Sequence, residues 1–191
     1  MADLGSQTTT TTTATRSLPL SGAHGGSSTV RLELAAPAER LSLRVRAGDV
    51  AAMSSALGLD LPVRPKTSAT ANGRTALWLG PDEWFVIADV GNGLAAAAAQ
   101  SGAMHSATDI SHRNTAILVS GAGAAQAINA GCPQDLSLAV FPVGACARTV
   151  FGKIEIVLLR TADDAFRVEC WRSFSDYAFG LLHEGAQDAG L

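Results

Sequence analysis

The sequence is poor in charged residues and has no long apolar run, and each shortage excludes a class of protein. Of its 191 residues, 14 are Lys or Arg and 17 are Asp or Glu, so that 16% are charged, against about 25% in an average domain. The basic residues are scattered, which argues against a nucleic-acid interface. No run approaches the ~18 apolar residues of a membrane span. We therefore expect neither nucleic acid nor membrane as a partner.

Cysteine is also scarce. The three cysteines form no Cys-x-x-Cys pair and are odd in number, which fits a reducing compartment better than a secreted disulfide framework. The four histidines share no ligand spacing with one another or with the cysteines, so no metal site is expected. Residues 1–15 lack the basic head and apolar run of a signal peptide. We expect a cytoplasmic protein whose cysteines are small buried apolar residues.

The residues that are abundant in this sequence are apolar. Hydrophobic residues make up 47% of the chain and the mean hydropathy is +0.20, which suggests that part of the folded surface is covered by a permanent partner. An alanine-rich composition would raise the mean hydropathy equally well without any exposed apolar patch. Composition alone does not distinguish these two explanations. A chain of this length can bury about two thirds of its surface without a disulfide or metal.

The chain divides into a Thr-, Gly- and Ser-rich tail at 1–28, which we expect to be disordered, a folded domain at 29–185 and a short tail at 186–191. Within the domain, alternating apolar residues predict strands, and spacings of three and four predict helices. The expected strands are at 30–34, 41–46, 75–79, 84–88, 115–119, 147–151, 154–159 and 166–171, and the expected helices are at 49–57, 94–101, 121–130 and 174–182.

The domain contains an internal repeat. Residues 41–62 resemble 115–137, and 75–89 resemble 155–170, which divides the domain into halves at about 30–103 and 104–185. Each half would run strand, helix, strands, helix. We therefore predict an α+β fold of two pseudo-repeated strand-helix-strand units with mainly antiparallel sheets.

The sequence offers three groups that imitate catalytic or binding motifs. The Gly121-Ala122-Gly123 turn lacks the third glycine and the acidic residue of a dinucleotide fingerprint. Asp109, Ser111, His112 and Arg113 are too close along the chain for a catalytic triad, so Asp109 and Ser111 are expected to pin their loop. The carboxylate pairs at 82–83 and 163–164 occupy equivalent turns. No catalytic, cofactor-binding or metal residue is predicted.

Four residues are predicted to lie at a subunit interface. Trp171 falls on the polar phase of its strand, and an outward tryptophan is typical of an interface anchor. Trp84 is the corresponding aromatic candidate in the first half, and Leu138 and Phe141 lie in an apolar loop without helical spacing. A loop that folds back on the core explains the last two equally well.

Several segments taken together resemble the gamma subunit family of heterotetrameric sarcosine oxidase. They are GPDEW at 80–84, DISHRN at 109–114, NAGCPQDL at 129–136, FPVG at 141–144 and WRSFSDY at 171–177. The similarity covers most of residues 30–185 and excludes the threonine tail. Each motif alone would be weak, but the set is specific.

The resemblance implies a fold similar to the folate-binding domain of the aminomethyltransferase, or glycine-cleavage T-protein, superfamily. It also implies a non-catalytic structural subunit, with alpha, beta and delta subunits as partners, in a complex that converts sarcosine and oxygen to glycine and hydrogen peroxide, with methylenetetrahydrofolate formed from tetrahydrofolate. In that family FAD, FMN, NAD and folate belong to the alpha and beta subunits and zinc to the delta subunit. The alternative is a stand-alone folate-binding or aminomethyltransferase-like protein.

Overall fold

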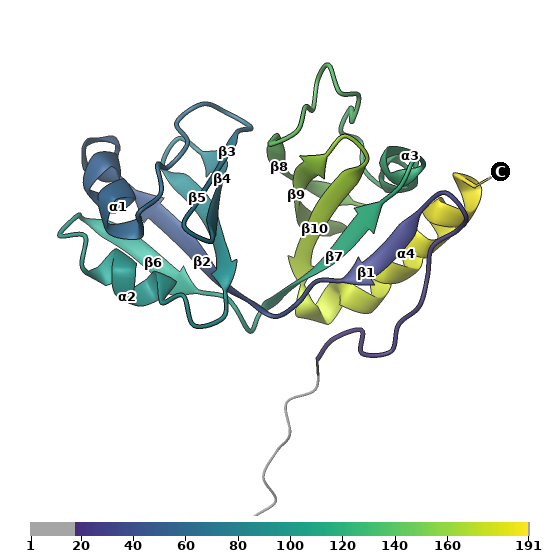
Figure 1. Cartoon of the computed structure of the whole chain (residues 1–191), viewed down its shortest axis with the longest axis horizontal. Helices are drawn as coiled ribbons and strands as arrows, with labels where there is room; N and C mark the ends of the chain where they lie inside the picture. Colours follow the sequence, from purple (N-terminus) through teal and green to yellow (C-terminus); the bar gives the residue numbers. More distant parts are fainter. Residues whose placement is uncertain (1–17, 191) are drawn as a thin grey trace, which may run out of the picture.

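The structure, a computed structural model, describes residues 18–190 and contains two five-stranded sheets with helices on their outer faces (Figure 1). The strand orders are β1-β7-β10-β9-β8 and β3-β4-β5-β2-β6, and the pairings are antiparallel, as predicted. The strands are β1 Arg31–Leu34, β2 Ala38–Val45, β3 Ser68–Ala71, β4 Arg74–Gly80, β5 Glu83–Asp89, β6 His105–Asp109, β7 Asn114–Ser120, β8 Cys146–Phe151, β9 Ile154–Ala162 and β10 Ala165–Trp171. The helices are α1 Val50–Leu57, α2 Leu94–Ala99, α3 Ala124–Asn129 and α4 Ser175–Asp188, with short 3-10 turns at Ala47–Asp49 and Arg172–Phe174.

The two predicted repeats are present, and each gives its first strand to the sheet of the other. The same order of elements runs from β1 to α2 and again from β6 to α4. Strand β1 pairs with β7 of the second repeat, and β6 pairs with β2 of the first. The linkers that follow β1 and β6 therefore cross between the sheets at one place, low in the centre of Figure 1. Because of this exchange, a boundary at 103/104 does not separate the two sheets in space.

Each sheet packs one face on its own helices and the other on the opposite sheet. Met53 of α1 and Leu94 of α2 belong to the core under the β2-β5 sheet, while Ile128 of α3 and Leu182 of α4 belong to the core under the β7-β10 sheet. A third apolar cluster joins the sheets and contains Leu77, Phe85, Ile87, Ile110, Cys146, Val157 and Leu159. This arrangement predicts strands that are apolar on both faces where the sheets meet.

Glycine is required at two turns of the structure. Asn72 and Gly73 both have positive φ, 51° and 72°, and form the two-residue turn between β3 and β4, the geometry favoured in tight hairpins. Gly121 has φ +114°, and a Cβ there would lie 2.3 Å from the backbone oxygen of Thr29. The Gly121-Ala122-Gly123 segment therefore serves a close backbone crossing.

Two strands of the structure were not predicted. Strands β3 and β6 were missed because they are short and rich in Ala, Ser and Thr, without apolar alternation. Asp49, at the start of the predicted helix 49–57, is the N-cap residue of α1, but its side chain makes no capping hydrogen bond.

Helix α4 buries most of the apolar stripe that its spacing predicts. The apolar residues at 174, 177, 178, 181 and 182 predict one inward face; Ala178 and Leu182 are buried and Leu181 packs on the core, as predicted, but Phe174 and Tyr177 are exposed. Gly185 lies at the contact with α3, where a Cβ would lie 2.5 Å from the Ala127 oxygen. Small residues let α4 approach α3 closely, and that contact fixes which face is inside.

Both ends of the folded domain extend beyond the predicted boundaries of 29 and 185. The Gly26 amide donates to His183 Nδ1 at 3.1 Å, and Leu20 packs on the core. Helix α4 continues to Asp188, with Ala186 fully buried. Within the described residues, the segments outside the folded domain are therefore shorter than the predicted tails. Residues 1–17 of the expected disordered segment lie outside the described residues.

Candidate functional site

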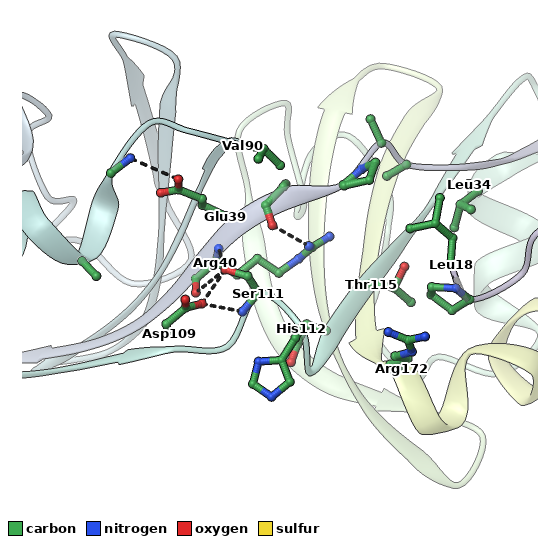
Figure 2. A pocket seen from close by; sticks show the side chains of 18 of the residues that line it. Leu18, Leu34, Glu39, Arg40, Val90, Asp109, Ser111, His112, Thr115 and Arg172 are labelled. Carbon is green, nitrogen blue, oxygen red and sulfur yellow. Dashed lines mark hydrogen bonds between the residues drawn. The ribbon is translucent and has the colours of Figure 1, made fainter. Parts of the chain in front are cut away.

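The place where the two linkers cross is also the site of the main pocket. The pocket has a volume of about 730 Å³. Its walls include Ala36, Val90, Glu39, Asp109 and His112, so apolar and polar groups both reach it (Figure 2). Residues from both repeats are thus brought together by the strand exchange.

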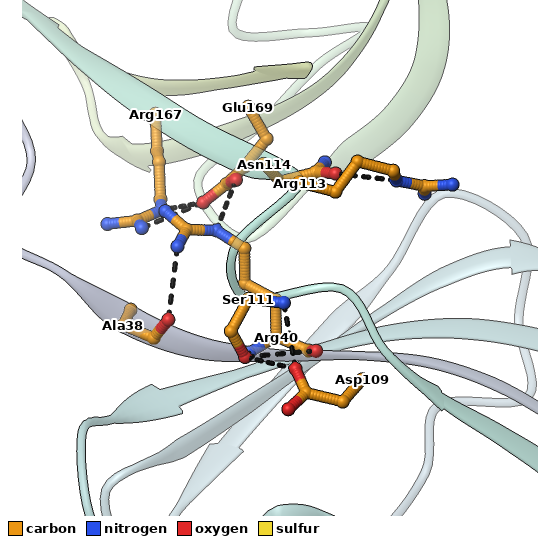
Figure 3. Close-up of polar contacts among 8 residues, drawn as sticks. All are labelled: Ala38, Arg40, Asp109, Ser111, Arg113, Asn114, Arg167 and Glu169. Carbon is orange, nitrogen blue, oxygen red and sulfur yellow. Dashed lines mark hydrogen bonds and ion pairs between the residues drawn. The ribbon is translucent and has the colours of Figure 1, made fainter. Parts of the chain in front are cut away.

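Asp109 and Ser111 pin the second linker to β2, as predicted. The Ser111 amide donates to Asp109 Oδ1 at 2.8 Å, and the Ser111 hydroxyl donates to the same carboxylate (Figure 3). Ser111 Oγ also accepts the Arg40 amide at 2.9 Å. Within residues 18–190 no hydrogen bond joins His112 to Ser111, so these side chains do not form a nucleophile and base pair. The hydroxyl and the amide of Ser111 hold the pKa of Asp109 below its ordinary value of 3.8.

Removing the hydroxyl of Ser111 should therefore change the titration of Asp109. A carboxyl with a lowered pKa in the folded state stabilises the protein above its unfolded pKa, and this contribution is lost as the pH falls through the folded value. In Ser111→Ala we expect the pKa of Asp109 to rise toward 3.8, with a smaller loss of stability between neutral and acidic pH. NMR titration of the Asp109 carboxyl carbon measures the shift. An unchanged pKa in Ser111→Ala would contradict the assignment.

Glu39 is the second carboxylate at the pocket, and it is used to hold the start of α2. Its oxygens accept the amides of Gly91, Gly93 and Leu94 at 2.9, 3.1 and 2.8 Å. Burial opposes ionisation of Glu39, but the amides of Leu94, Gly93 and Gly91 together outweigh it, so the pKa lies below its ordinary 4.5. Like Asp109, this group already has internal partners.

A buried ionic network lies behind the pocket and joins the two repeats. Arg40 of β2 donates from Nε to Glu169 of β10 at 2.7 Å and from a terminal nitrogen to the Ala38 oxygen at 3.1 Å (Figure 3). Arg167 donates to the other oxygen of Glu169 at 2.8 Å. The side chains of Arg40 and Glu169 are only 3% and 1% exposed. The network therefore holds the β2 sheet against the β10 sheet.

The other polar candidates from the sequence are also structural. Asp82 and Glu83 both pair with Arg44, and Glu83 also pairs with Arg148 of the second repeat. Asp163 and Asp164 lie in the turn between β9 and β10. The predicted equivalence of the two turns is confirmed, and the ion pairs link the repeats at a second point.

The cysteines are free and buried, as predicted. Burial raises the pKa of Cys146 to about 11 and that of Cys170 to about 12, so both thiols are protonated at neutral pH. Among residues 18–190, no group of three or more His, Cys, Asp or Glu side chains is placed to hold a metal ion. In the same part of the chain, no helix has the length and apolar character needed to span a membrane.

The four predicted interface residues separate into two pairs. Trp84 and Phe141 are core residues, which corrects their assignment as interface anchors. The Trp84 ring is buried, with its Nε1 donating to the Pro62 oxygen at 2.8 Å. Phe141 is fully buried in the core of the second sheet, and Arg160, also buried, donates to its carbonyl oxygen at 3.0 Å. Trp171 and Leu138 are 41% and 49% exposed.

Sequence reasoning missed the neighbours that complete the exposed surface around Trp171. Phe174 stacks on Trp171 with ring centroids 5.8 Å apart, and the Arg113 guanidinium lies 5.1 Å from the Trp171 ring centroid. Tyr177 is exposed on the next turn of the chain. The apolar spacing of Phe174 and Tyr177 was the available signal, but that spacing predicts that both rings lie on the buried stripe of the last helix.

A family model and two similar proteins indicate the same family. The model of the sarcosine oxidase gamma subunit family matches residues 45–189. The gamma subunit of Arthrobacter sp. is 35% identical over 62% of this chain and 60% of its own length, so the aligned part spans less than two thirds of that relative. The gamma subunit of Corynebacterium sp. strain P-1 is 31% identical over 81% of this chain and 78% of its own length.

Two solved structures are similar in fold. One chain of the heterotetrameric sarcosine oxidase of Corynebacterium sp. U-96, in complex with pyrrole 2-carboxylate, has a TM-score of 0.80 and 26% identity, with 90% of this chain and 93% of that chain covered. The aminomethyltransferase T of Bartonella henselae has a TM-score of 0.62 and 15% identity over 84% of this chain and 49% of its own. The expected likeness to the T-protein fold is confirmed.

Proposed function

Because this chain belongs to the sarcosine oxidase gamma subunit family, we propose that it is a structural, non-catalytic subunit of a heterotetrameric sarcosine oxidase. The observation that supports this proposal most strongly is the structural similarity to a chain of such a heterotetramer, which covers 90% of this chain. The engagement of Asp109 and Glu39 by internal hydrogen bonds supports it. Both pocket carboxylates hold the fold together, so a catalytic use would compete with their structural one.

The complex that we propose contains alpha, beta and delta subunits beside this chain and works in the cytoplasm. By family resemblance, it oxidises sarcosine with oxygen to glycine and hydrogen peroxide, and methylenetetrahydrofolate is formed from tetrahydrofolate. FAD, FMN, NAD, tetrahydrofolate and zinc would all be held by the other subunits. No residue of this chain is assigned to any of them.

Exposed apolar side chains support a role in assembly. One group lies around Trp171, and a second lies on the 134–144 loop, where Leu138, Val140 and Val143 are about half exposed. Arg160 donates to backbone oxygens of this loop and is buried beneath it. Because buried hydrogen bonds already fix this loop, its exposed apolar residues would lose little conformational entropy when a partner binds. Low entropy loss favours an interface role.

Omitting this chain should impair the complex. We expect co-expression of the alpha, beta and delta subunits alone to yield at least about tenfold less intact oxidase than co-expression of all four, because the covered apolar surface would be left open. Purified gamma chain alone should not oxidise sarcosine. Size-exclusion chromatography with a peroxide assay measures both. A stable, fully active oxidase without this chain would refute the proposal.

The pocket beside Asp109 and the T-protein-like fold support a second candidate function, that of a stand-alone folate-binding protein. The discriminating measurement is made on the purified chain. A monodisperse chain that binds tetrahydrofolate with a micromolar dissociation constant would favour this candidate over the structural subunit. A chain that associates with the other subunits at equal stoichiometry would exclude it.

A further inference from the structure

The surface around Trp171 is organised as a rigid group of rings with a cation on one side. We define the aromatic-arginine cluster as Arg113, Trp171, Phe174 and Tyr177. The three rings are 41%, 41% and 42% exposed in that order. Trp171 and Phe174 are stacked with an interplanar angle of 15°, and Arg113 contacts the Trp171 ring. Trp, Tyr and Arg are the residues in which interface hot spots are enriched.

The cluster is held by ordered elements on every side. Trp171 is the last residue of β10 and pairs with Asn114 of β7. The Arg172 amide donates to the Arg113 oxygen at 2.7 Å, which ties the two segments of the cluster together. The Tyr177 hydroxyl accepts the Lys153 amide at 3.2 Å. Rings that are already fixed lose little conformational freedom when a partner covers them.

The charge of the cluster determines the kind of partner. Arg113 is the cation in contact with the Trp171 ring, and the backbone amide of Lys153 contacts Tyr177. Asp176 of α4 and Glu155 of β9 are acidic residues of the same segments. The charge in direct contact with the rings is therefore positive, on a chain of net charge −3. A second copy of this chain in a twofold dimer would bring like charges together at the centre. A partner with carboxylates around an apolar socket matches the cluster in both shape and charge.

We propose that the aromatic-arginine cluster is the docking site for a larger subunit of the oxidase, which covers the rings with an apolar socket rimmed by carboxylates. The identity of the occupant rests on the proposed function. Trp171 enters the socket, and Arg113 pairs with the acidic rim while remaining on the indole ring. The 134–144 loop is a separate surface of the molecule and is not required for this contact.

The test uses the full-length chain co-expressed with the other three subunits. Trp171→Ala should raise the dissociation constant of this chain from the complex at least about 30-fold, the effect of losing a hot spot. Arg113→Glu should raise it at least about tenfold, and Arg113→Lys should fall between wild type and Arg113→Glu, since it keeps the charge but loses the planar stack. Met104→Ala, which truncates an exposed apolar side chain outside the aromatic-arginine cluster, should change it less than about twofold. Native mass spectrometry on dilution gives the constants.

The possible outcomes distinguish failure of the proposed docking site from failure of the proposed function. If the wild-type chain does not associate, the proposed function fails and the inference fails with it. If the wild type associates and the Trp171 and Arg113 variants do so equally well, only the docking site is refuted. Wild-type chain that dimerises alone, with dimerisation lost in Trp171→Ala, would assign the cluster to a second copy and overturn the proposal. Thermal unfolding of each variant checks folding, and Arg113→Glu, an exposed change, remains informative if Trp171→Ala is unstable.

Discussion

Replacing Glu169 by alanine should lower the free energy of unfolding by about 3–5 kcal/mol, the usual effect of removing one partner from a buried ion pair. Glu169 accepts hydrogen bonds from Arg40 and Arg167, and both its carboxylate oxygens are used. Without it, two guanidinium groups remain in the contact between the sheets. A domain of this size has roughly 5–15 kcal/mol in total, so the variant should be marginally stable. Urea denaturation followed by circular dichroism measures the change.

Glu33 provides the matched control, because it is also a strand glutamate of the same sheet that pairs with an arginine. Its pair with Arg31 is exposed, with side chains 45% and 73% accessible. Glu33→Ala should therefore change stability by less than about 0.5 kcal/mol. A combined Arg40→Met, Arg167→Met and Glu169→Leu variant should recover most of the loss, since removing all three charges leaves none unpaired. Equal effects of Glu33→Ala and Glu169→Ala would refute the role given to the network.

The alternation of residues in β10 predicts which side chains share a face of the strand, but not what covers each face. It placed Arg167, Glu169 and Trp171 on one face of the strand and Phe166, Val168 and Cys170 on the other, and the structure has this phase. Alternation alone predicts that the polar face is exposed to solvent along its whole length. Only its end at Trp171 is exposed, because the opposite sheet covers Glu169.

The second sheet also explains why Trp84 was misassigned. Strand β5 is buried along five successive residues, from Trp84 to Ala88, and β9 is buried from Ile156 to Arg160. Continuous apolar runs of this kind are typical of strands covered on both faces. The runs were visible in the sequence, but the covering layer was not, since it depends on contacts between residues about 80 positions apart. For the same reason the repeat was found while the exchange of β1 and β6 was not.

Because β1 and β6 are exchanged, each half depends on the other for a complete sheet. The second large predicted effect is therefore on the folding of the separated halves. If the chain is divided after Gly102, in the turn between α2 and β6, we expect neither fragment to show cooperative unfolding alone. The fragment ending at Gly102 would lack β6, its sheet's edge strand, and would expose the unpaired β1. The fragment beginning at Ala103 would lack β1 in the same way. Mixed in equal amounts, the two should recover the native circular dichroism spectrum and cooperative melting.

The recovery is expected because, once the chain is cut, the contacts that remain between the halves are noncovalent and numerous. Strand pairs β1-β7 and β2-β6 lie across the cut, together with the Arg40 and Glu169 pair, the Arg148 and Glu83 pair and the apolar cluster between the sheets. A control division between Asp163 and Asp164 separates β9 from β10 inside one sheet and one core. It should complement more weakly, because the most densely paired hairpin is broken. A fragment ending at Gly102 that folds cooperatively as a monomer would show that the halves are independent domains and that the exchanged strands are dispensable.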